Sequence, residues 1–231
     1  MRTYEQDLPL IFMHIPKTGG NAVKHVLIRW YGKDQYIRPY REGLIELKDD
    51  PRLGNSPVVL GGHWPVSKGV LEAVAPQIED RQIITVVRDV FSMCKSMYSY
   101  GLQRDGDTAA RRAGSWDAYL DSLHKKRGGI SMFSYLPRVQ GKYCLTTYSR
   151  QFMMVGITEN LELSIAHLGV LIGREAPETI PIRNPTKEKP NDVNDDRREE
   201  IEGLFPREVE FYNAAKQAVE RGKPLGWGYG G

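Results

Sequence analysis

The sequence has only two cysteines and no long apolar run. Cys94 and Cys144 are too few for a disulfide framework, and neither has other metal-ligating residues at a suitable spacing. The apolar run near the N-terminus is short and is interrupted by Pro9 and His14, so it predicts neither a signal peptide nor a membrane span. Together these features predict a soluble protein of the cytoplasm.

The sequence also lacks an excess of charge of either sign. Its 231 residues carry 32 basic and 29 acidic side chains, a formal net charge of +3. This balance does not indicate a protein that binds nucleic acid through bulk charge. Any preference for an anionic ligand must therefore come from a local group of residues.

Short β-branched runs alternate with segments of helical periodicity along the chain. Strands are predicted over residues 8–15, 58–60, 83–87 and 152–157, and helices over 22–31, 89–103, 115–123, 159–172, 197–204 and 206–222. The alternation predicts an α/β fold in which helices flank a central, mainly parallel sheet, formed by a single domain over residues 1–231. Residues 177–196, rich in proline and charge, are predicted to form a loop.

Residues 14–23, HIPKTGGNAV, lie where the first predicted strand meets the first predicted helix. They lack both glycines of the ATP-binding pattern GxxxxGK[ST], because Ile11 and Pro16 stand in those positions. Gly19 and Gly20 instead follow the lysine. Backbone N–H groups and the helix dipole at such a turn can hold an anion. The alternative is that the two glycines only form a tight turn.

Residues 14–20 match throughout the signature HxPKTGGT/S of sulfotransferases that use 3′-phosphoadenosine 5′-phosphosulfate (PAPS). The chain resembles the carbohydrate branch of that family, which includes heparan sulfate 2-O-sulfotransferase. Asn21 replaces the usual serine or threonine, and its amide can still donate a hydrogen bond. The resemblance implies a P-loop-containing nucleotide hydrolase-like fold and a 5′-phosphosulfate site. It assigns this site to Lys17, Thr18, Gly19, Gly20 and Asn21.

Residues 88–100, RDVFSMCKSMYSY, resemble the second motif of the family, RDPxxRxxSxYxY. Val90 and Met93 replace its proline and its second arginine. The resemblance assigns Arg88 and Ser96 to the 3′-phosphate. The residues support this independently, because Arg88 follows a strand at the edge where parallel sheets bind ligands, and a guanidinium offers a rigid fork of donors. The alternative is an ion pair of Arg88 with Asp89 or another carboxylate.

His63 follows a predicted strand and a Gly-Gly turn, so we expect it at the same edge of the sheet as Lys17 and Arg88. A neutral imidazole can take the proton of an acceptor hydroxyl near neutral pH, and the resemblance also points to His63 as the base. In a packing role His63 would instead lie against Trp64 and Pro65. The alternative bases are Glu72 and Asp105.

The resemblance extends more weakly to residues 153–168 and 183–190. The first segment is similar to the family's late strand and helix, and the second is similar to the loop that follows them. In this loop Lys187 and Lys189 could reach the cofactor, and Lys187 is assigned to it. The alternative is a charged, solvated loop.

These observations predict an enzyme that transfers a sulfuryl group in line from PAPS to an acceptor hydroxyl of a sugar or glycan. Lys17 is expected to stabilise the charge that grows on the leaving phosphate, and His63 to act as the base. No metal is expected, and adenosine 3′,5′-bisphosphate is the second product. The residues between Gly101 and Gly141, expected around the acceptor, carry no recognisable pattern.

Two other functions remain open at this stage. A small-molecule kinase with a P-loop would need Mg²⁺ and an acidic residue after a buried strand. A non-catalytic module could bind anionic glycans through a basic group, although the same charges could form an ordinary solvated face. This group consists of Arg111, Arg112, Lys125, Lys126 and Arg127.

Overall fold

The computed structural model describes residues 3–38, 51–54, 57–63, 82–125, 131–137, 143–180, 190 and 192–227. Its centre is a five-stranded sheet with the order β2-β3-β1-β4-β5, in which every neighbouring pair is parallel. The strands are β1 (Leu10–Met13), β2 (Tyr36–Ile37), β3 (Val59–Gly62), β4 (Gln82–Val87) and β5 (Met154–Ile157). The predicted α/β class with a parallel sheet is confirmed.

Helices follow most of the strands, as the periodicity predicts. They are α1 (Gly20–Tyr31), α4 (Val90–Gln103), α5 (Ala109–Ala113), α6 (Trp116–Lys125), α7 (Leu145–Ser149), α8 (Leu161–Ile172), α9 (Arg198–Leu204) and α10 (Pro206–Glu220). Two 3₁₀ turns, η1 (Pro51–Gly54) and η5 (Met132–Ser134), lie between them. Among the described helices, none combines the length and the apolar character needed to cross a bilayer.

Gly32 ends α1 with φ of 90°, and Ser115 accepts a hydrogen bond from the N–H of Ala118 in α6, both as the sequence predicts. The two-residue strand β2 and the short helices α5 and α7 are absent from the prediction. Such short elements carry too few residues for a periodic pattern, and packing against neighbouring elements decides them.

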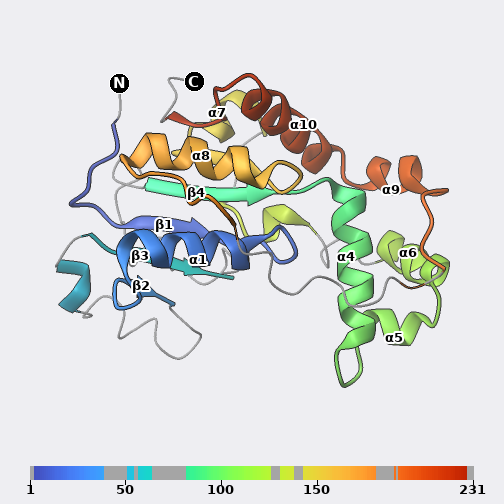
Figure 1. Ribbon diagram of the computed structural model, residues 1–231. Coiled ribbons are helices and arrows are strands. Elements are labelled where there is room, and N and C mark those ends of the chain that lie inside the picture. The colour runs from blue at the N-terminus through green and yellow to red at the C-terminus, as the bar shows by residue number, and fades with distance from the viewer. Residues whose placement is uncertain are drawn as a thin grey trace.

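Both faces of the sheet are buried, which explains why its strands are continuous apolar runs. Leu10 and Phe12 of β1 pack on the face that α1 and α8 cover, whereas Ile11 and Met13 pack on the opposite face. On that second face α10 packs against β5, and its Phe211 belongs to the same cluster as Ile11 and Met13. The helices α4 and α6 add side chains to this cluster from beyond the carboxyl ends of the strands, whereas α1 and α8 run along the first face (Figure 1).

The connections diverge between the two central strands. From β1 the chain passes through α1 toward β2 at one end of the sheet, whereas β4 leads through α4 toward β5 at the other. The strands point to the right in Figure 1, so the carboxyl ends of β1 and β4 face α4. Ligands of parallel α/β sheets bind in the crevice at such a switch in strand order.

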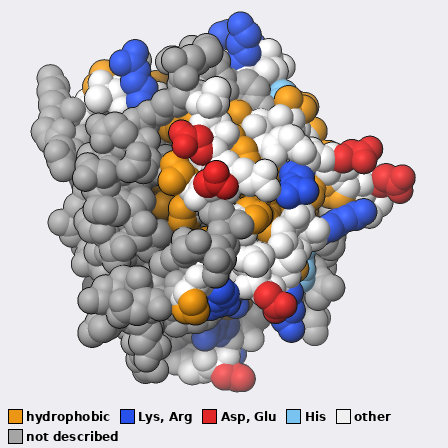
Figure 2. All heavy atoms as spheres, turned by 90° about the vertical axis from the view of Figure 1, so that its left-hand side faces the viewer, with side chains coloured by type: hydrophobic (Ala, Val, Ile, Leu, Met, Phe, Trp, Pro, Cys, Tyr) orange, Lys and Arg blue, Asp and Glu red, His pale blue; other side chains and the backbone are white. Residues whose placement is uncertain are grey.

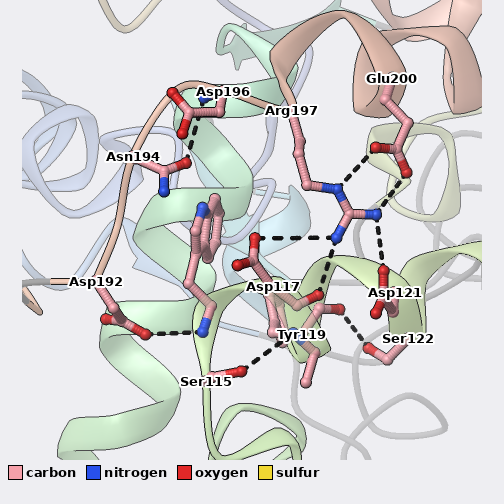
Figure 3. A network of polar contacts seen from close by, with 12 residues as sticks. Ser115, Asp117, Tyr119, Asp121, Ser122, Asp192, Asn194, Asp196, Arg197 and Glu200 are labelled. Carbon is pink, nitrogen blue, oxygen red and sulfur yellow. Dashed lines mark hydrogen bonds and ion pairs between the residues drawn. The ribbon is translucent and has the colours of Figure 1, made fainter.

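The described end of the predicted loop is fastened to the helices beside this crevice. The Asp192 carboxylate accepts hydrogen bonds from the hydroxyl of Tyr98 in α4, at 3.1 Å, and from the N–H of Trp116 in α6, at 2.8 Å. Arg197 pairs with Asp121 at 2.7 Å and with Glu200 at 2.6 Å (Figure 3). These contacts hold the segment that leads into α9 against α4 and α6.

Gly61 provides a stability test of the sheet. A Cβ atom at this position would lie 1.9 Å from the Tyr36 hydroxyl oxygen and 2.3 Å from its Cζ atom. Because Tyr36 is buried on β2, we expect Gly61→Ala to lower the free energy of unfolding by about 1–3 kcal/mol in urea denaturation.

The matched control is Gly203→Ala in α9, where an added Cβ meets nothing within 4 Å. Alanine favours a helix over glycine by about 1 kcal/mol, so this variant should be as stable as the original protein or more stable. Equal losses in the two variants would contradict the proposed clash with Tyr36.

Candidate functional site

The loop between β1 and α1 presents a row of free backbone donors. None of the N–H groups of residues 17–21 donates to another residue that the structure describes. Lys17 has φ of 66° and Gly19 has φ of 76°, so the left-handed conformation recurs within this turn. Turns of this kind form concave anion sites, and a non-glycine residue in this conformation is characteristic of functional loops.

The Thr18 side chain stabilises the loop from inside. It is 1% exposed, and its hydroxyl donates to the Ile15 carbonyl at 2.9 Å. Its hydroxyl proton is therefore committed to the loop, and Thr18 faces an anion only through its backbone N–H. Asn21 differs, because its side chain is exposed and makes no polar contact with a described residue.

The Lys17 ammonium group rests on an aromatic ring of the second motif. Its Nζ lies 4.1 Å from the ring centroid of Tyr100, a residue of α4 that is 42% exposed. No carboxylate of the described residues lies within ion-pair distance of Lys17. Burial lowers the pKa of Lys17, and the charge of Arg88 lowers it further. An anion at the loop would relieve both effects.

Arg88 connects the second motif to the first. Its Nη1 donates to the Lys17 carbonyl at 3.0 Å, and its Nε lies 3.9 Å from Glu159, beyond hydrogen-bond distance. Burial lowers the pKa of Arg88, and the nearby Glu159 and Asp89 carboxylates partly offset this. Within the described part of the chain its Nη2 donates to no group. One nitrogen of the guanidinium thus remains available to a ligand.

Asp89 is not the partner of Arg88. Its carboxylate accepts from the N–H of Ser92 at 2.7 Å, which caps α4, and Arg198 approaches both of its oxygens at 3.1 Å. The carboxylate that approaches Arg88 is Glu159, which follows β5. The predicted alternative of an ion pair therefore occurs with Glu159, in a long and weak form.

Ser96 lies two helical turns after Arg88, within α4. Its side chain is half-buried, and its hydroxyl makes no hydrogen bond with any described residue. A serine inside a helix commonly bonds the carbonyl one turn back, and Ser96 does not. Among the described residues nothing therefore competes with a ligand for its hydroxyl.

His63 follows β3 and is held by the backbone of β1. Its Nδ1 lies 2.8 Å from the His14 carbonyl. A carbonyl oxygen only accepts, so Nδ1 carries the proton and the other ring nitrogen, Nε2, has a free lone pair in the neutral imidazole. Although the side chain is exposed, partial desolvation lowers the pKa of His63, the hydrogen bond to His14 raises it and Arg38 lowers it. The net effect lowers the pKa of His63 from its ordinary value, which favours the neutral imidazole near pH 7.

The other predicted site residues divide into two groups. Asp105 is exposed after α4, Arg112 pairs with Asp107 at 2.7 Å, and Arg111 donates to the Leu102 carbonyl at 3.0 Å. Lys125 is exposed at the end of α6, and the remaining ones lie outside the described residues: Trp64, Pro65, Glu72, Lys126, Arg127, Lys187 and Lys189.

Sequence reasoning missed three residues that contact the predicted site. Glu159 approaches Arg88, and the ring of Tyr100 lies under the Lys17 ammonium. The His14 ring lies against His63 with 3.9 Å between ring centroids. Tyr100 and His14 belong to the two motifs, so their positions could have been noticed. Nothing near Glu159 in the sequence indicates a contact with a residue 71 positions earlier.

The amino ends of the strands offer a different surface. Figure 2 looks onto this side, where acidic, basic and hydrophobic side chains are intermixed in the described part. A cavity of about 490 Å³ lies where α1 and α8 end, and Arg29 and Arg174 share its wall with Glu175 and Glu178. Its wall charges balance, so they do not favour an anion over a cation.

Comparisons with known proteins bear on the fold. No family model matches the chain, and no curated protein sequence matches it. The structure is similar to the crystal structure of mouse sulfotransferase SULT7A1 complexed with PAP, at a TM-score of 0.57 and 12% sequence identity. The match covers 95% of this chain and 89% of that one. At this identity the likeness extends to the fold, and this chain has the fold of that sulfotransferase.

Proposed function

We propose that the protein is a sulfotransferase that uses PAPS as its donor. The observation that carries the proposal is the row of free N–H groups at residues 17–21, placed beside Lys17 and Arg88 at the switch in strand order. Free donors and two cations at one point suit a ligand with several anionic groups. The structurally similar mouse enzyme was crystallised with PAP, which supports the same class of ligand.

The loop is the proposed site of the 5′-phosphosulfate. The N–H groups of residues 17–21 and the amino end of α1 supply fixed dipoles, and the Lys17 ammonium supplies a full charge. Both stabilise negative charge on the oxygen that leaves sulfur. The Asn21 amide is a further donor at the exposed side of the loop.

Arg88 and Ser96 are the proposed ligands of the 3′-phosphate. Arg88 offers Nη2, and Ser96 offers a hydroxyl without another partner among the described residues. The contact of Arg88 with the Lys17 carbonyl joins this subsite to the phosphosulfate loop. Lys187 remains a predicted contact of the cofactor.

His63 is the proposed base. When the donor is bound, it supplies an electrophilic sulfur and an anionic leaving group, adenosine 3′,5′-bisphosphate. His63 Nε2 takes the proton of the acceptor hydroxyl as the new oxygen–sulfur bond forms and the old one breaks. The hydrogen bond from Nδ1 to the His14 carbonyl selects the tautomer that this step requires.

A carbohydrate acceptor, a single domain and a cytoplasmic location remain predictions. The acceptor rests on the resemblance of the two motifs, the single domain on the alternation of strands and helices, and the location on the two cysteines and the short N-terminal apolar run.

Two contacts disfavour the kinase alternative. In a P-loop kinase the loop serine or threonine and an acidic residue after a buried strand hold Mg²⁺. Here Thr18 is 1% exposed and its hydroxyl turns inward to donate to the Ile15 carbonyl, while the Asp89 carboxylate accepts from the cap of α4 and from Arg198. Burial of the first side chain and the existing partners of the second both disfavour a metal site in this arrangement.

Nucleotide binding tests the assignment of Arg88 and Ser96. Arg88→Ala and Ser96→Ala should weaken binding of adenosine 3′,5′-bisphosphate in calorimetry. Loss of a charge-assisted contact costs about 1.5–3 kcal/mol, or roughly one to two decades in affinity. Binding of adenosine 5′-phosphate, which lacks the 3′-phosphate, should change little.

Arg112→Ala, outside both motifs in the sequence, is the control with unchanged affinity for both nucleotides. Equal losses for both nucleotides in Arg88→Ala would refute the assignment.

Removal of divalent metals tests the choice between sulfuryl and phosphoryl transfer. Turnover with PAPS should survive EDTA, because Lys17 and the loop dipoles stabilise the leaving group without an ion. A loss of turnover in EDTA that Mg²⁺ restores would favour the kinase.

His63→Ala should lower kcat by about 10²–10⁴-fold while the affinity for adenosine 3′,5′-bisphosphate changes little. In the original protein kcat should fall at acid pH, because protonation removes the lone pair of Nε2. The pKa of His63 is lowered from 6.5, so the midpoint of this fall should lie below pH 6.5. His124→Ala, at an exposed histidine paired with Glu200, is the control. Normal kcat in folded His63→Ala would move the base to another residue.

A further inference from the structure

His14 lies between the phosphate-binding loop and His63, and the proposed mechanism makes no use of its side chain. The residue is 9% exposed. Its ring faces the ring of His63 with a centroid distance of 3.9 Å and an angle of 33° between the planes. On another side it fills the space above Gly20, where a Cβ atom would lie 1.8 Å from the His14 Cδ2 atom. The His14 ring therefore touches both halves of the site.

The position of the His14 ring is set by the sheet. The ring stacks on Phe12, two residues earlier on the same side of β1, with a centroid distance of 5.5 Å and an angle of 11°. The His14 N–H donates to the Gly62 carbonyl at 3.0 Å, which prolongs the pairing of β1 with β3 up to the residue before His63. The neighbouring carbonyl of His14 then accepts from His63 Nδ1. One residue thus contacts His63 through its ring and through its backbone.

His14 itself carries no proton to or from a substrate. Among the described residues, the charged and titratable groups that face the pair are Lys24 on α1, Arg38 after β2 and, beside His63, Tyr135 with 6.5 Å between ring centroids. Burial foremost, and then His63, Arg38 and Lys24, lower the pKa of His14 to about 3. The buried His14 ring is therefore neutral at pH 7, and its effect on His63 is one of contact.

We propose that His14 is the positioning residue of the base: its ring is a wedge between the phosphate-binding loop and His63 that keeps Nε2 of His63 free and directed to the substrate side. The catalytic consequence rests on the proposed function, whereas the hold on His63 is a property of the free protein. The wedge also explains Gly20, since any side chain there would displace the His14 ring.

The alternative is that His14 only fills space in the core. Both roles predict a loss of stability when the ring is removed. They differ in the state of the His63 imidazole, which a space-filling residue would leave unchanged. The tautomer and the pKa of His63 are therefore the informative measurements.

The experiment follows His63 by ¹⁵N and ¹H NMR of the imidazole in the full chain, in His14→Ala, His14→Phe and, as a control at a histidine of α8, His167→Ala. In the original protein and in the control, His63 should show a protonated Nδ1 and an unprotonated Nε2. His14→Ala keeps the carbonyl that accepts from Nδ1 but removes the ring that holds His63 against it, so we expect a mixture of tautomers. The His63 pKa should rise, because water then reaches the imidazole and desolvation is the largest cause of its lowering. His14→Phe keeps an aromatic ring of similar size and should preserve the original pattern.

Kinetics with PAPS supply the second measurement. In His14→Ala kcat should fall by about 10²-fold, the cost of a misplaced catalytic group, and the acid midpoint should move toward pH 6.5. The affinity for adenosine 3′,5′-bisphosphate should change much less than kcat, and His14→Phe should restore kcat. Gly20→Ala, which displaces the ring from the other side, should disturb the His63 tautomer in the same direction and provides the test if His14→Ala fails to fold.

An unchanged His63 tautomer and pKa in folded His14→Ala or Gly20→Ala would overturn the proposal. So would a His14→Phe variant as impaired as His14→Ala, because the wedge requires only a ring. If the original protein shows no turnover with PAPS, the proposed function fails, and the NMR comparison still decides whether His14 holds His63.

Discussion

The pairing of β1 with both β3 and β4 is the constraint on which the site depends. These three parallel strands end at the same edge of the sheet, and each continues directly into a residue or loop of the site. The loop proposed to bind the phosphosulfate follows β1, His63 follows β3 and Arg88 follows β4. Because the register of the strands is set by burial of both faces, the positions of these side chains follow from the packing of the core.

The electrostatics of this edge favour an anion. Lys17 and Arg88 are partly buried and lie close enough for Arg88 to lower the pKa of Lys17. Among the described carboxylates, Glu159 alone approaches this pair of cations to ion-pair distance, through its long contact with Arg88. The backbone adds a row of N–H groups that donate to no described residue. Desolvated positive charge that is only partly compensated is costly, and a bound phosphate or sulfate group would reduce this cost. The stability of the protein and the occupancy of the site should therefore be coupled.

Close packing links the two halves of the site. Gly20 allows the His14 ring to approach the start of α1, and the same ring lies against His63. In the sequence, Gly20 indicates only a turn or an anion-binding loop. In the structure it has a second role, because it leaves room for the His14 ring. The proposed anion site and the proposed base share the His14 ring as one wall, so we expect a change at either to affect the other.

From the sequence one can predict the α/β class, most of the helices, the strand-loop-helix at residues 8–31 and the residue types of the candidate anion site. These depend on local periodicity, on glycine positions and on short motifs, all of which can be recognised without the fold. The folded structure adds the contacts that no motif predicts: Glu159 approaches Arg88, the Lys17 ammonium lies over the Tyr100 ring and the Thr18 hydroxyl points into the loop. It also decided the tautomer of His63, because the His14 carbonyl that selects it lies 49 residues away in the chain. The physical reason is that contacts between side chains from different strands depend on the strand order and register, which no local pattern in the sequence encodes.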